Sequence, residues 1–361
     1  MALTGKGFFI WKIQECEGGS PAAIVSAAKA AGLSHVLIKI ADGMNHSNVD
    51  KASGTDFVPP LVQALHAAGI QAWGWHYIYG DDPVGEAWNG GRRARALGLD
   101  GYVIDAEREY KAPGMDVKAQ RFAADLRGYL GTIPAALSSF RFPSYHKEFP
   151  WSAFLQKSDF NMPQVYWEQS HNAGAQLTRS FREFQTLTPT RPVIATGSAY
   201  GNNGWAPTAA DITDFLKTAV SLNIPAVNFY SWDYCRKSLP ALWNIIAAFP
   251  YPGTKPEGIE QRLISALNSR DLQAVSALYT ENAVHITAAR TVQGREAILN
   301  WYKEFFAKHP AGTVFSLTAQ TGQDQTRNIS WAYTLSSNTS RGKDSLGLEE
   351  DLISYHFTTL G

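Results

Sequence analysis

Short apolar, β-rich runs alternate with longer helical stretches over residues 1–250, and this alternation constrains the fold more than any other feature. It is typical of parallel βαβ units. Eight runs are expected to be strands: 7–13, 35–40, 71–79, 101–107, 133–139, 161–167, 191–198 and 224–232. Eight strands, each followed by a helix, predict a (β/α)₈ barrel, the TIM barrel. An open, doubly wound sheet is the alternative, but QECEGGSP after the first strand lacks the glycine pattern with which that fold binds phosphates.

The sequence pattern changes after a Pro- and Gly-rich stretch, FPYPGTKPEG. We expect a barrel over 1–250, a linker over 251–257 and a second, α+β domain over 258–361. In the second domain, helices are expected over 259–270, 271–279 and 294–309, and strands over 283–287, 313–321, 327–337 and 348–360. Helices gathered before a run of strands predict an antiparallel sheet.

The chain carries 32 basic and 32 acidic residues, so its charge gives no reason to expect nucleic acid or an anionic membrane as partner. No apolar run approaches the ~20 residues of a transmembrane helix. The start, MALTGKGFFIWKIQECEGG, does not resemble a secretory signal, so a cytoplasmic location is expected. The nine histidines are scattered and the two cysteines are far apart, so neither a metal nor another cofactor is expected.

The stretch GLDGYVIDAEREY raises a question of charge, because an apolar strand ends in Asp105, Ala106 and Glu107. Alternate residues of a strand point to the same side, so both carboxylates would face the barrel interior, where unpaired charges are costly. On the other strands, we take the set of alternate residues that carries polar side chains to face the interior as well. These polar residues lie near the carboxyl ends of the strands, where barrel enzymes carry their active sites. These residues are Lys12, Gln14, Lys39, His76, Gln164, Tyr166, Glu168, Asn228, Tyr230 and Trp232. We therefore expect a site for a carbohydrate or another small molecule at this end.

The run from Asp100 to Glu107 resembles the D-G-x-D-x-D-x-E signature of chitinase-like glycoside hydrolases, with Val103 in place of the middle Asp. The segments MPQVYWE and NFYSWDY are similar to that family's sixth and eighth strands. The segments VLIKIADG, GWHYIY and VIDAE are similar to strands of lysozyme-type muramidases. The resemblance implies a hydrolase that acts on an N-acetylated or cell-wall-type glycan.

Catalytic roles follow from this resemblance. Glu107 would be the general acid, and Asp105 would orient the substrate's N-acetyl group or stabilise the oxocarbenium-like transition state. Tyr166 would hydrogen-bond the reacting group, and Glu168 and Asp233 would be spare carboxylates for a two-carboxylate mechanism. The remaining residues of the expected site would bind substrate, with Trp232 stacked on the sugar: Lys12, Lys39, His76, Gln164, Asn228, Tyr230 and Trp232.

A barrel that binds glycan without cutting it, or serves as a scaffold, is an alternative. Val103 removes a carboxylate that would tune Asp105, and Lys39 would then lock Asp105 in an ion pair.

The second domain resembles the SnoaL-like, polyketide-cyclase branch of the nuclear-transport-factor-2-like superfamily. The segments that carry the resemblance are RLISALNSRDLQAVSALYTENAVH and GREAILNWYKEFFAKH. It implies a cone-shaped fold, a homodimer formed through the sheet, and an apolar pocket that includes His285, Trp301 and Tyr333. A third functional hypothesis places an isomerase, cyclase or small-molecule-binding site in this pocket. The alternative is that these aromatic residues only fill a small core.

Overall fold

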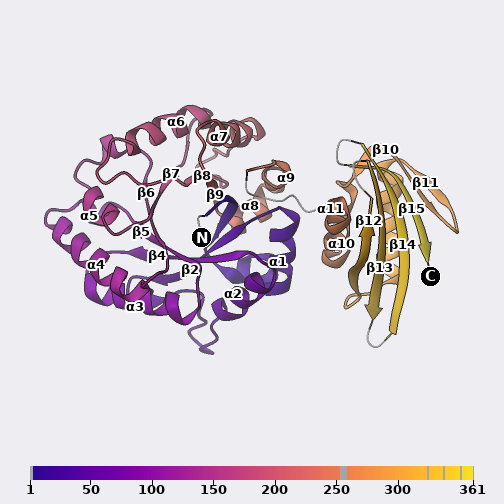
Figure 1. Cartoon of the computed structure of the whole chain (residues 1–361), viewed down its shortest axis with the longest axis horizontal. Coiled ribbons are helices and arrows are strands. Elements are labelled where there is room, and N and C mark those ends of the chain that lie inside the picture. Colours follow the sequence, from indigo (N-terminus) through magenta and orange to yellow (C-terminus); the bar gives the residue numbers. More distant parts are fainter. Residues whose placement is uncertain (1–2, 253–257, 323–324, 336–337, 350–351, 361) are drawn as a thin grey trace. The chain divides into compact units, whose positions relative to one another are not determined.

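Among the described residues, eight parallel strands form a closed barrel in the first part of the chain. Figure 1 looks into this barrel. The strands are β1 (Gly5–Ile10), β2 (His35–Asp42), β4 (Gln71–Ile78), β5 (Gly101–Ala106), β6 (Ala135–Phe140), β7 (Phe160–Val165), β8 (Ala195–Ser198) and β9 (Ala226–Tyr230). The sheet closes because β1 pairs with both β2 and β9, so that Phe8 lies opposite Val36 and Phe229. A two-residue strand, β3 (Asn45–His46), folds back antiparallel on the end of β2. The predicted barrel fold is confirmed.

The computed structural model describes residues 3–252, 258–322, 325–335, 338–349 and 352–360. The chain divides into a barrel unit, residues 1–255, and a second unit, residues 256–361. Most of the predicted linker, 253–257, lies outside the described residues, whereas Tyr251 is buried and donates to the carbonyl of Ile224 in the barrel unit.

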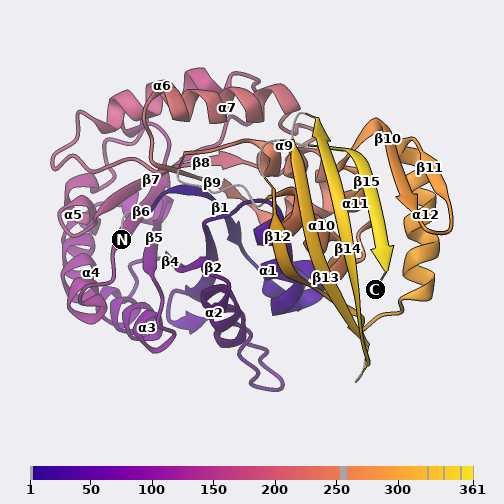
Figure 2. The same cartoon turned by 45° about the vertical axis from the view of Figure 1, so that its right-hand side comes forward.

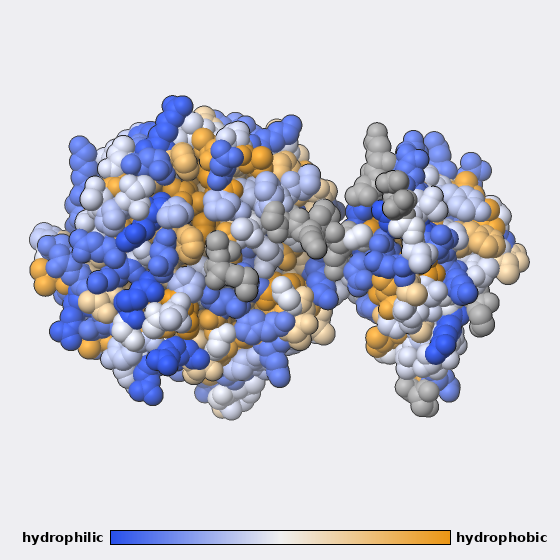
Figure 3. Space-filling model, in the orientation of Figure 1, coloured by the Kyte–Doolittle hydropathy of each residue, from blue (hydrophilic) through white to orange (hydrophobic). Residues whose placement is uncertain are grey.

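Helices surround the barrel, and hydrophilic residues cover much of their outer edge in Figure 3. They are α1 (Pro21–Ala30), α2 (Val58–Ala67), α3 (Pro83–Ala96), α4 (Met115–Leu130), α5 (Trp151–Leu155), α6 (Ala173–Phe184), α7 (Ala209–Ser221), α8 (Trp232–Ser238) and α9 (Pro240–Ala248). The local sequence defines where several of these helices begin. Ser20 caps α1, and Thr208 and Asp211 form a capping box at α7.

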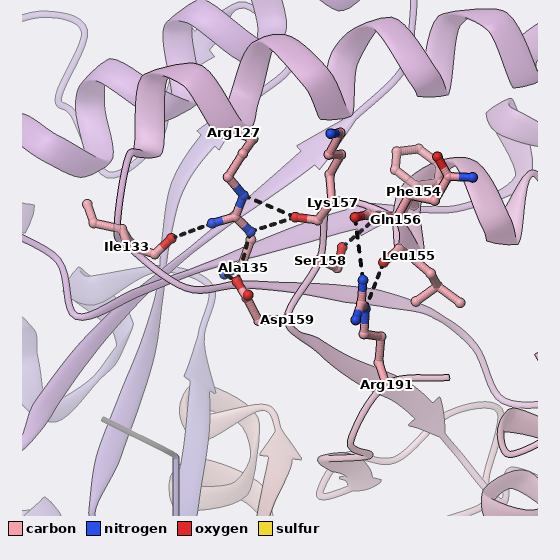
Figure 4. A network of polar contacts seen from close by, with 10 residues as sticks. All are labelled: Arg127, Ile133, Ala135, Phe154, Leu155, Gln156, Lys157, Ser158, Asp159 and Arg191. Atoms are coloured by element: carbon pink, nitrogen blue, oxygen red, sulfur yellow. Dashed lines mark hydrogen bonds and ion pairs between the residues drawn. The ribbon is translucent and has the colours of Figure 1, made fainter. Parts of the chain in front are cut away.

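An arginine network anchors the segment around α5, as Figure 4 shows. Arg127 donates to the carbonyls of Ile133 and Lys157 and forms an ion pair with Asp159. Arg191 donates to the carbonyl of Leu155 at the end of α5. The Leu155 carbonyl lies at a helix end and lacks a partner within the helix, so Arg191 satisfies it. Arg127 links the residues before β6 to those before β7.

Two layers of apolar side chains hold the barrel unit together. One lies inside the barrel and consists of Leu3, Phe9, Leu37, Trp73, Trp75, Val103, Ala136, Met162, Ile194 and Ala226. The other lies between strands and helices and includes Tyr102 and Ile104. The predicted parity of β5, with Val103 inside and its neighbours outside, is therefore correct.

Among its described residues, the second unit packs three helices against a six-stranded sheet. Figure 2 shows this unit from another side. The helices are α10 (Ile259–Ser269), α11 (Leu272–Ser276) and α12 (Arg295–Lys308), and the strands are β10 (Tyr279–Thr287), β11 (Thr291–Gln293), β12 (Val314–Thr321), β13 (Thr326–Leu335), β14 (Asn338–Glu349) and β15 (Leu352–Leu360). Their order in the sheet is β11-β10-β15-β14-β13-β12, and β10 and β15 run parallel. The predicted α+β class is confirmed, but the expectation of an antiparallel sheet holds only in part, because β10 and β15 pair in parallel.

Strand β14 is the main difference from the expected elements. The segment 348–360 was expected to be one strand, but β14 ends at Glu349 and β15 begins at Leu352. Strand β14 buries alternate residues, as a strand packed on one face does. The buried positions include Gly342 and Asp344, so apolar periodicity does not reveal the strand.

Among the helices that the structure describes, none combines the length and apolar character needed to cross a bilayer.

Glycine at position 7 is required by a close approach inside the barrel. A Cβ atom there would lie 2.2 Å from Nε2 of the buried His35 ring. We expect Gly7→Ala to lower the free energy of unfolding by about 1–3 kcal/mol, because overpacking strains the strand.

Gly128 is the matched control. It is exposed in α4, and a Cβ atom added there would meet no other atom within 4 Å, so Gly128→Ala should stabilise the protein by about 0.5–1 kcal/mol. Urea unfolding followed by circular dichroism measures both changes. Equal stability of Gly7→Ala and wild type would contradict the packing argument.

Candidate functional site

A cavity of about 360 Å³ opens at the carboxyl end of the barrel strands. Its described lining residues are Phe9, Trp11, Lys39, Asp42, Trp75, Tyr77, Tyr79, Asp105, Glu107, Arg108, Glu109, Ser138, Gln164, Tyr166 and Tyr230. They come from β1, β2, β4, β5, β6, β7 and β9 or from the residues that follow these strands. Closure of a parallel barrel brings these ends together, which is why barrel enzymes build their sites there.

Asp105 and Glu107 share one hydrogen-bond donor. The side-chain nitrogen of Gln164 lies 3.0 Å from Oδ1 of Asp105 and 2.9 Å from Oε1 of Glu107. Because both oxygens contact the same nitrogen, the two carboxyl groups face one space, as the alternation along the strand predicts. The same nitrogen lies 3.4 Å from Oγ of Ser138.

Burial changes the protonation of this pair. Asp105 is only 9% exposed, and burial, followed by the nearby charge of Glu107, holds its pKa well above the usual range. Burial also raises the pKa of Glu107, while the hydrogen bond from Gln164 opposes the rise. The pair therefore keeps a proton at a higher pH than free carboxyl groups do.

Lys39 faces the cavity, as expected, but its ion-pair partner is Asp42. The Nζ atom lies 2.6 Å from Oδ2 of Asp42, whereas Oδ1 of Asp42 accepts a hydrogen bond from the Tyr79 hydroxyl. The ammonium group lies 4.8 Å from the centre of the Trp75 ring, in a cation–π contact. The expectation that Lys39 forms an ion pair with Asp105 is therefore wrong.

A fourth acidic residue, Glu109, borders the cavity. Glu109 accepts a hydrogen bond from the Tyr77 hydroxyl at 2.9 Å and pairs with Arg108 at 3.1 Å. Burial acts to raise the pKa of Glu109, but its hydrogen bonds outweigh burial and hold the pKa below the usual range.

Aromatic rings form much of the remaining wall. Trp11 is 45% exposed and Tyr79 is 37% exposed, so both present ring surface to solvent at the rim. Tyr166 lies against Tyr200 and Tyr230, with ring centres 5.4 and 6.1 Å apart. Burial holds the pKa of Tyr166 well above its usual range, so its hydroxyl stays neutral and can donate a hydrogen bond.

Four of the expected barrel residues besides Asp105 and Glu107 lie in the cavity: Lys39, Gln164, Tyr166 and Tyr230. Lys12 does not, because β1 ends at Ile10 and the chain turns into a short 3₁₀ helix, Ile13–Glu15. Its ammonium group pairs with Glu15 in solvent, and Trp11 takes the inward position.

His76 points away from the barrel interior, contrary to the expectation. Its Nδ1 contacts the hydroxyl of Tyr102 at 2.6 Å, and its Nε2 contacts the carbonyl of Gly43 at 2.8 Å. The inward side chains of β4 are Trp73, Trp75 and Tyr77. The assumption that the polar parity faces inward fails on this strand because aromatic rings fill the interior there.

Asn228 and Trp232 also lie outside the set of cavity residues. Asn228 is inside the barrel but deeper, where its Oδ1 lies 2.6 Å from Nε2 of His35. Trp232 begins α8 and packs on Phe8 and Trp243, so the sugar-stacking role expected for it is wrong.

The two spare carboxylates have other surroundings. Glu168 accepts hydrogen bonds from the Tyr200 hydroxyl and from Asn202. Asp233 lies in the first turn of α8, where burial raises its pKa. Neither residue is among those that line the described cavity.

Nine cavity residues were not among the expected site residues: Phe9, Trp11, Asp42, Trp75, Tyr77, Tyr79, Arg108, Glu109 and Ser138. A signal was available for three of them, because aromatic residues occupy alternate positions 73, 75, 77 and 79. Asp42 and Glu109 lie where their strands end or in the loop beyond, where strand parity no longer applies.

In the second unit, His285 and Trp301 are neighbours, with ring centres 4.4 Å apart, whereas Tyr333 packs on Phe315 and His309. The structure adds a buried polar chain that was not expected. The hydroxyl of Tyr279 lies 2.6 Å from Nδ1 of His356, whose Nε2 lies 3.2 Å from Oδ2 of Asp344.

Within the described ranges, no group of three or more His, Cys, Asp or Glu side chains is arranged to hold a metal ion.

The raised pKa of Asp105 predicts a stability effect. When folding raises the pKa of a carboxyl group, the folded protein loses stability as pH rises toward and through that pKa. We expect Asp105→Asn to raise the free energy of unfolding at pH 8 by about 1–2 kcal/mol, with the gain shrinking toward pH 4. Urea unfolding at both pH values measures it. The exposed control Asp81→Asn should change neither value, and a less stable Asp105→Asn at pH 8 would refute the argument.

Comparisons with known proteins concern the second unit. Residues 261–350 match the model of the SnoaL-like domain. A candidate ketosteroid isomerase from Kribbella flavida is 18% identical over 28% of this chain and 75% of its own, with a TM-score of 0.26. A candidate polyketide cyclase from Sinorhizobium meliloti is 19% identical over 28% of this chain and 93% of its own, with a TM-score of 0.25. An NTF2-like protein of unknown function from Cytophaga hutchinsonii is 14% identical over 28% of this chain and 87% of its own, with a TM-score of 0.25.

No curated protein matches the chain at a significant level. The family match, together with the helices and sheet of the second unit, confirms that this part of the chain is a SnoaL-like domain with the NTF2-like fold.

Proposed function

We propose that the barrel unit hydrolyses a glycosidic bond in an N-acetylated or cell-wall-type glycan. The observation that carries the proposal is the pair Asp105 and Glu107, bridged by Gln164 in an open cavity whose walls are aromatic. Paired carboxyl groups of which one keeps its proton are the machinery that glycosidic cleavage requires.

Glu107 would act as the general acid. Its raised pKa keeps a proton available for the leaving glycosidic oxygen, and the C–O bond to the anomeric carbon breaks as that proton is transferred. Water then attacks the anomeric carbon and gives a proton back to the Glu107 carboxylate. The net change is one water consumed and one glycosidic bond replaced by two hydroxyl groups.

When the proton shared by the pair lies on Glu107, Asp105 would carry the compensating negative charge. Placed beside Glu107 by Gln164, its carboxylate stabilises positive charge at the anomeric centre or orients an N-acetyl group that attacks this carbon. The neutral hydroxyl of Tyr166, in the same cavity, is placed to donate a hydrogen bond to the reacting group.

Aromatic surfaces support a sugar as ligand. The faces of sugar rings are apolar C–H surfaces, and Trp11 and Tyr79 expose ring area at the rim for them. A barrel that binds glycan without cleavage remains the competing function, but the ion pair expected to inactivate Asp105 is made with Asp42 instead.

Replacing Glu107 tests the proposal. We expect Glu107→Gln to lower kcat on chromogenic N-acetylglucosaminides and oligosaccharides by about 10²–10⁴-fold, because the amide cannot donate an acidic proton. Glu148→Gln is the control, since Glu148 pairs with Lys111 and lies outside the set of lining residues. Wild-type activity in Glu107→Gln would exclude the assigned role. Glycan binding without turnover in both proteins would establish the binding-only function.

We propose as a second function that the SnoaL-like domain transfers protons on a small carbonyl compound, as an isomerase or cyclase does. The supporting observation is the chain Tyr279–His356–Asp344, whose members are all buried. Burial, followed by the neighbouring His356, lowers the pKa of His285 to about 2, so this ring stays neutral beside the chain. Neutral imidazole and a carboxylate are suitable proton acceptors.

Proton exchange tests this second function. The full chain is incubated with a small unsaturated ketone in D₂O, and exchange of the α-protons is followed by NMR. We expect exchange above the buffer rate, and a loss of at least about 10²-fold in Asp344→Asn, because the base is removed. Glu107→Gln should exchange like wild type. A rate equal to that of buffer in the wild-type chain would exclude the function.

A further inference from the structure

Four basic residues at the mouth of the barrel are paired with acids. Lys12 lies 3.2 Å from Glu15, and Lys39 lies 2.6 Å from Asp42. Arg108 lies 3.1 Å from Glu109, and Lys111 lies 2.7 Å from Glu148. Two of these cations, Lys39 and Arg108, belong to the residues that line the cavity.

Among the described residues, no cation forms an ion pair with Asp105 or Glu107, although the charge of Lys39 acts to lower the pKa of Asp105 and that of Arg108 acts to lower the pKa of Glu107. Their common partner is the neutral amide of Gln164. The described lining thus contains two cations and four carboxyl groups. Even when Asp105 and Glu107 share one proton, the cavity keeps an excess of negative charge. An anionic group on a ligand would find no unpaired cation among these residues.

We infer that this site selects glycans without acidic groups, and accepts neutral sugars and sugars that carry an amino group. The inference rests on the proposed glycan-binding function and narrows its substrate class. Like charges repel more strongly in a partly desolvated cavity than in water, so a carboxylate, sulfate or phosphate on the bound sugars raises the free energy of the complex. An ammonium group lowers it.

The contacts of Lys39 explain how the cavity would discriminate against anionic sugars. Its ammonium group is inside the cavity, but Asp42 and the Trp75 ring hold it. Removing the charge of Asp42 frees a cation that could then receive an anionic sugar. Asp42 is therefore a specificity-determining residue, and its replacement should change the ligand preference.

Three oligosaccharides of equal length and linkage test the inference. β-1,4-Linked tetramers of N-acetylglucosamine, glucosamine and glucuronic acid are titrated calorimetrically into full-length Glu107→Gln, in which turnover is blocked. We expect the uronate tetramer to bind at least about tenfold more weakly than the N-acetylglucosamine tetramer, and the glucosamine tetramer to bind as tightly or more tightly. The difference in affinity between the uronate and N-acetylglucosamine tetramers should narrow as the salt concentration is raised.

Asp42→Asn, added to this background, should improve uronate binding and narrow this difference. Asp125→Asn is the control, because Asp125 pairs with Arg121 on α4. This variant should leave the difference in affinity between the uronate and N-acetylglucosamine tetramers unchanged. Equal binding of the neutral and uronate tetramers overturns the selectivity alone. No binding of any tetramer overturns the glycan function and the selectivity with it.

Discussion

Closure of the barrel is the constraint on which the rest of the first unit depends. Once β1 pairs with β9 as well as β2, every strand has two neighbours and each residue faces either the interior or the helices. An isolated β5 could present Asp105 to solvent on either face. In the closed barrel its carboxyl group faces the same space as the side chains of β2, β4, β7 and β9, and the site follows from this geometry.

Two carboxyl groups inside a protein carry an energetic penalty, and the structure offsets only part of it. The side-chain amide of Gln164 donates to Asp105 and to Glu107, while raised pKa values record the cost that remains. Such a residual cost is typical of sites that retain reactive groups at the expense of stability. The second unit shows a related arrangement, because Oδ1 of the buried Asp344 lacks a hydrogen-bond partner among the described residues.

Much of the fold and part of the site could be predicted from the sequence. Eight β-rich runs indicated the barrel, and alternation along 101–107 indicated the orientation of Asp105 and Glu107 because that strand is regular up to its end. Parity failed for Lys12, where the strand stops early, and for His76, where indole and phenol rings occupy the interior. Strand β14 was missed because its buried positions include Gly342 and Asp344. The ion pair between Lys39 and Asp42 depends on side-chain geometry, which periodicity does not contain.

Gly101 has a consequence for passage through the barrel. Its missing side chain leaves room for the indole of Trp73, which would otherwise lie 2.3 Å from a Cβ atom. With Met162 and Val103, that indole fills the barrel below the cavity. The cylinder is thus plugged, and a molecule that enters from the mouth has to leave through the same opening. Arrival of the next ligand must wait for departure of the last, so the barrel cannot thread a polymer from one end to the other.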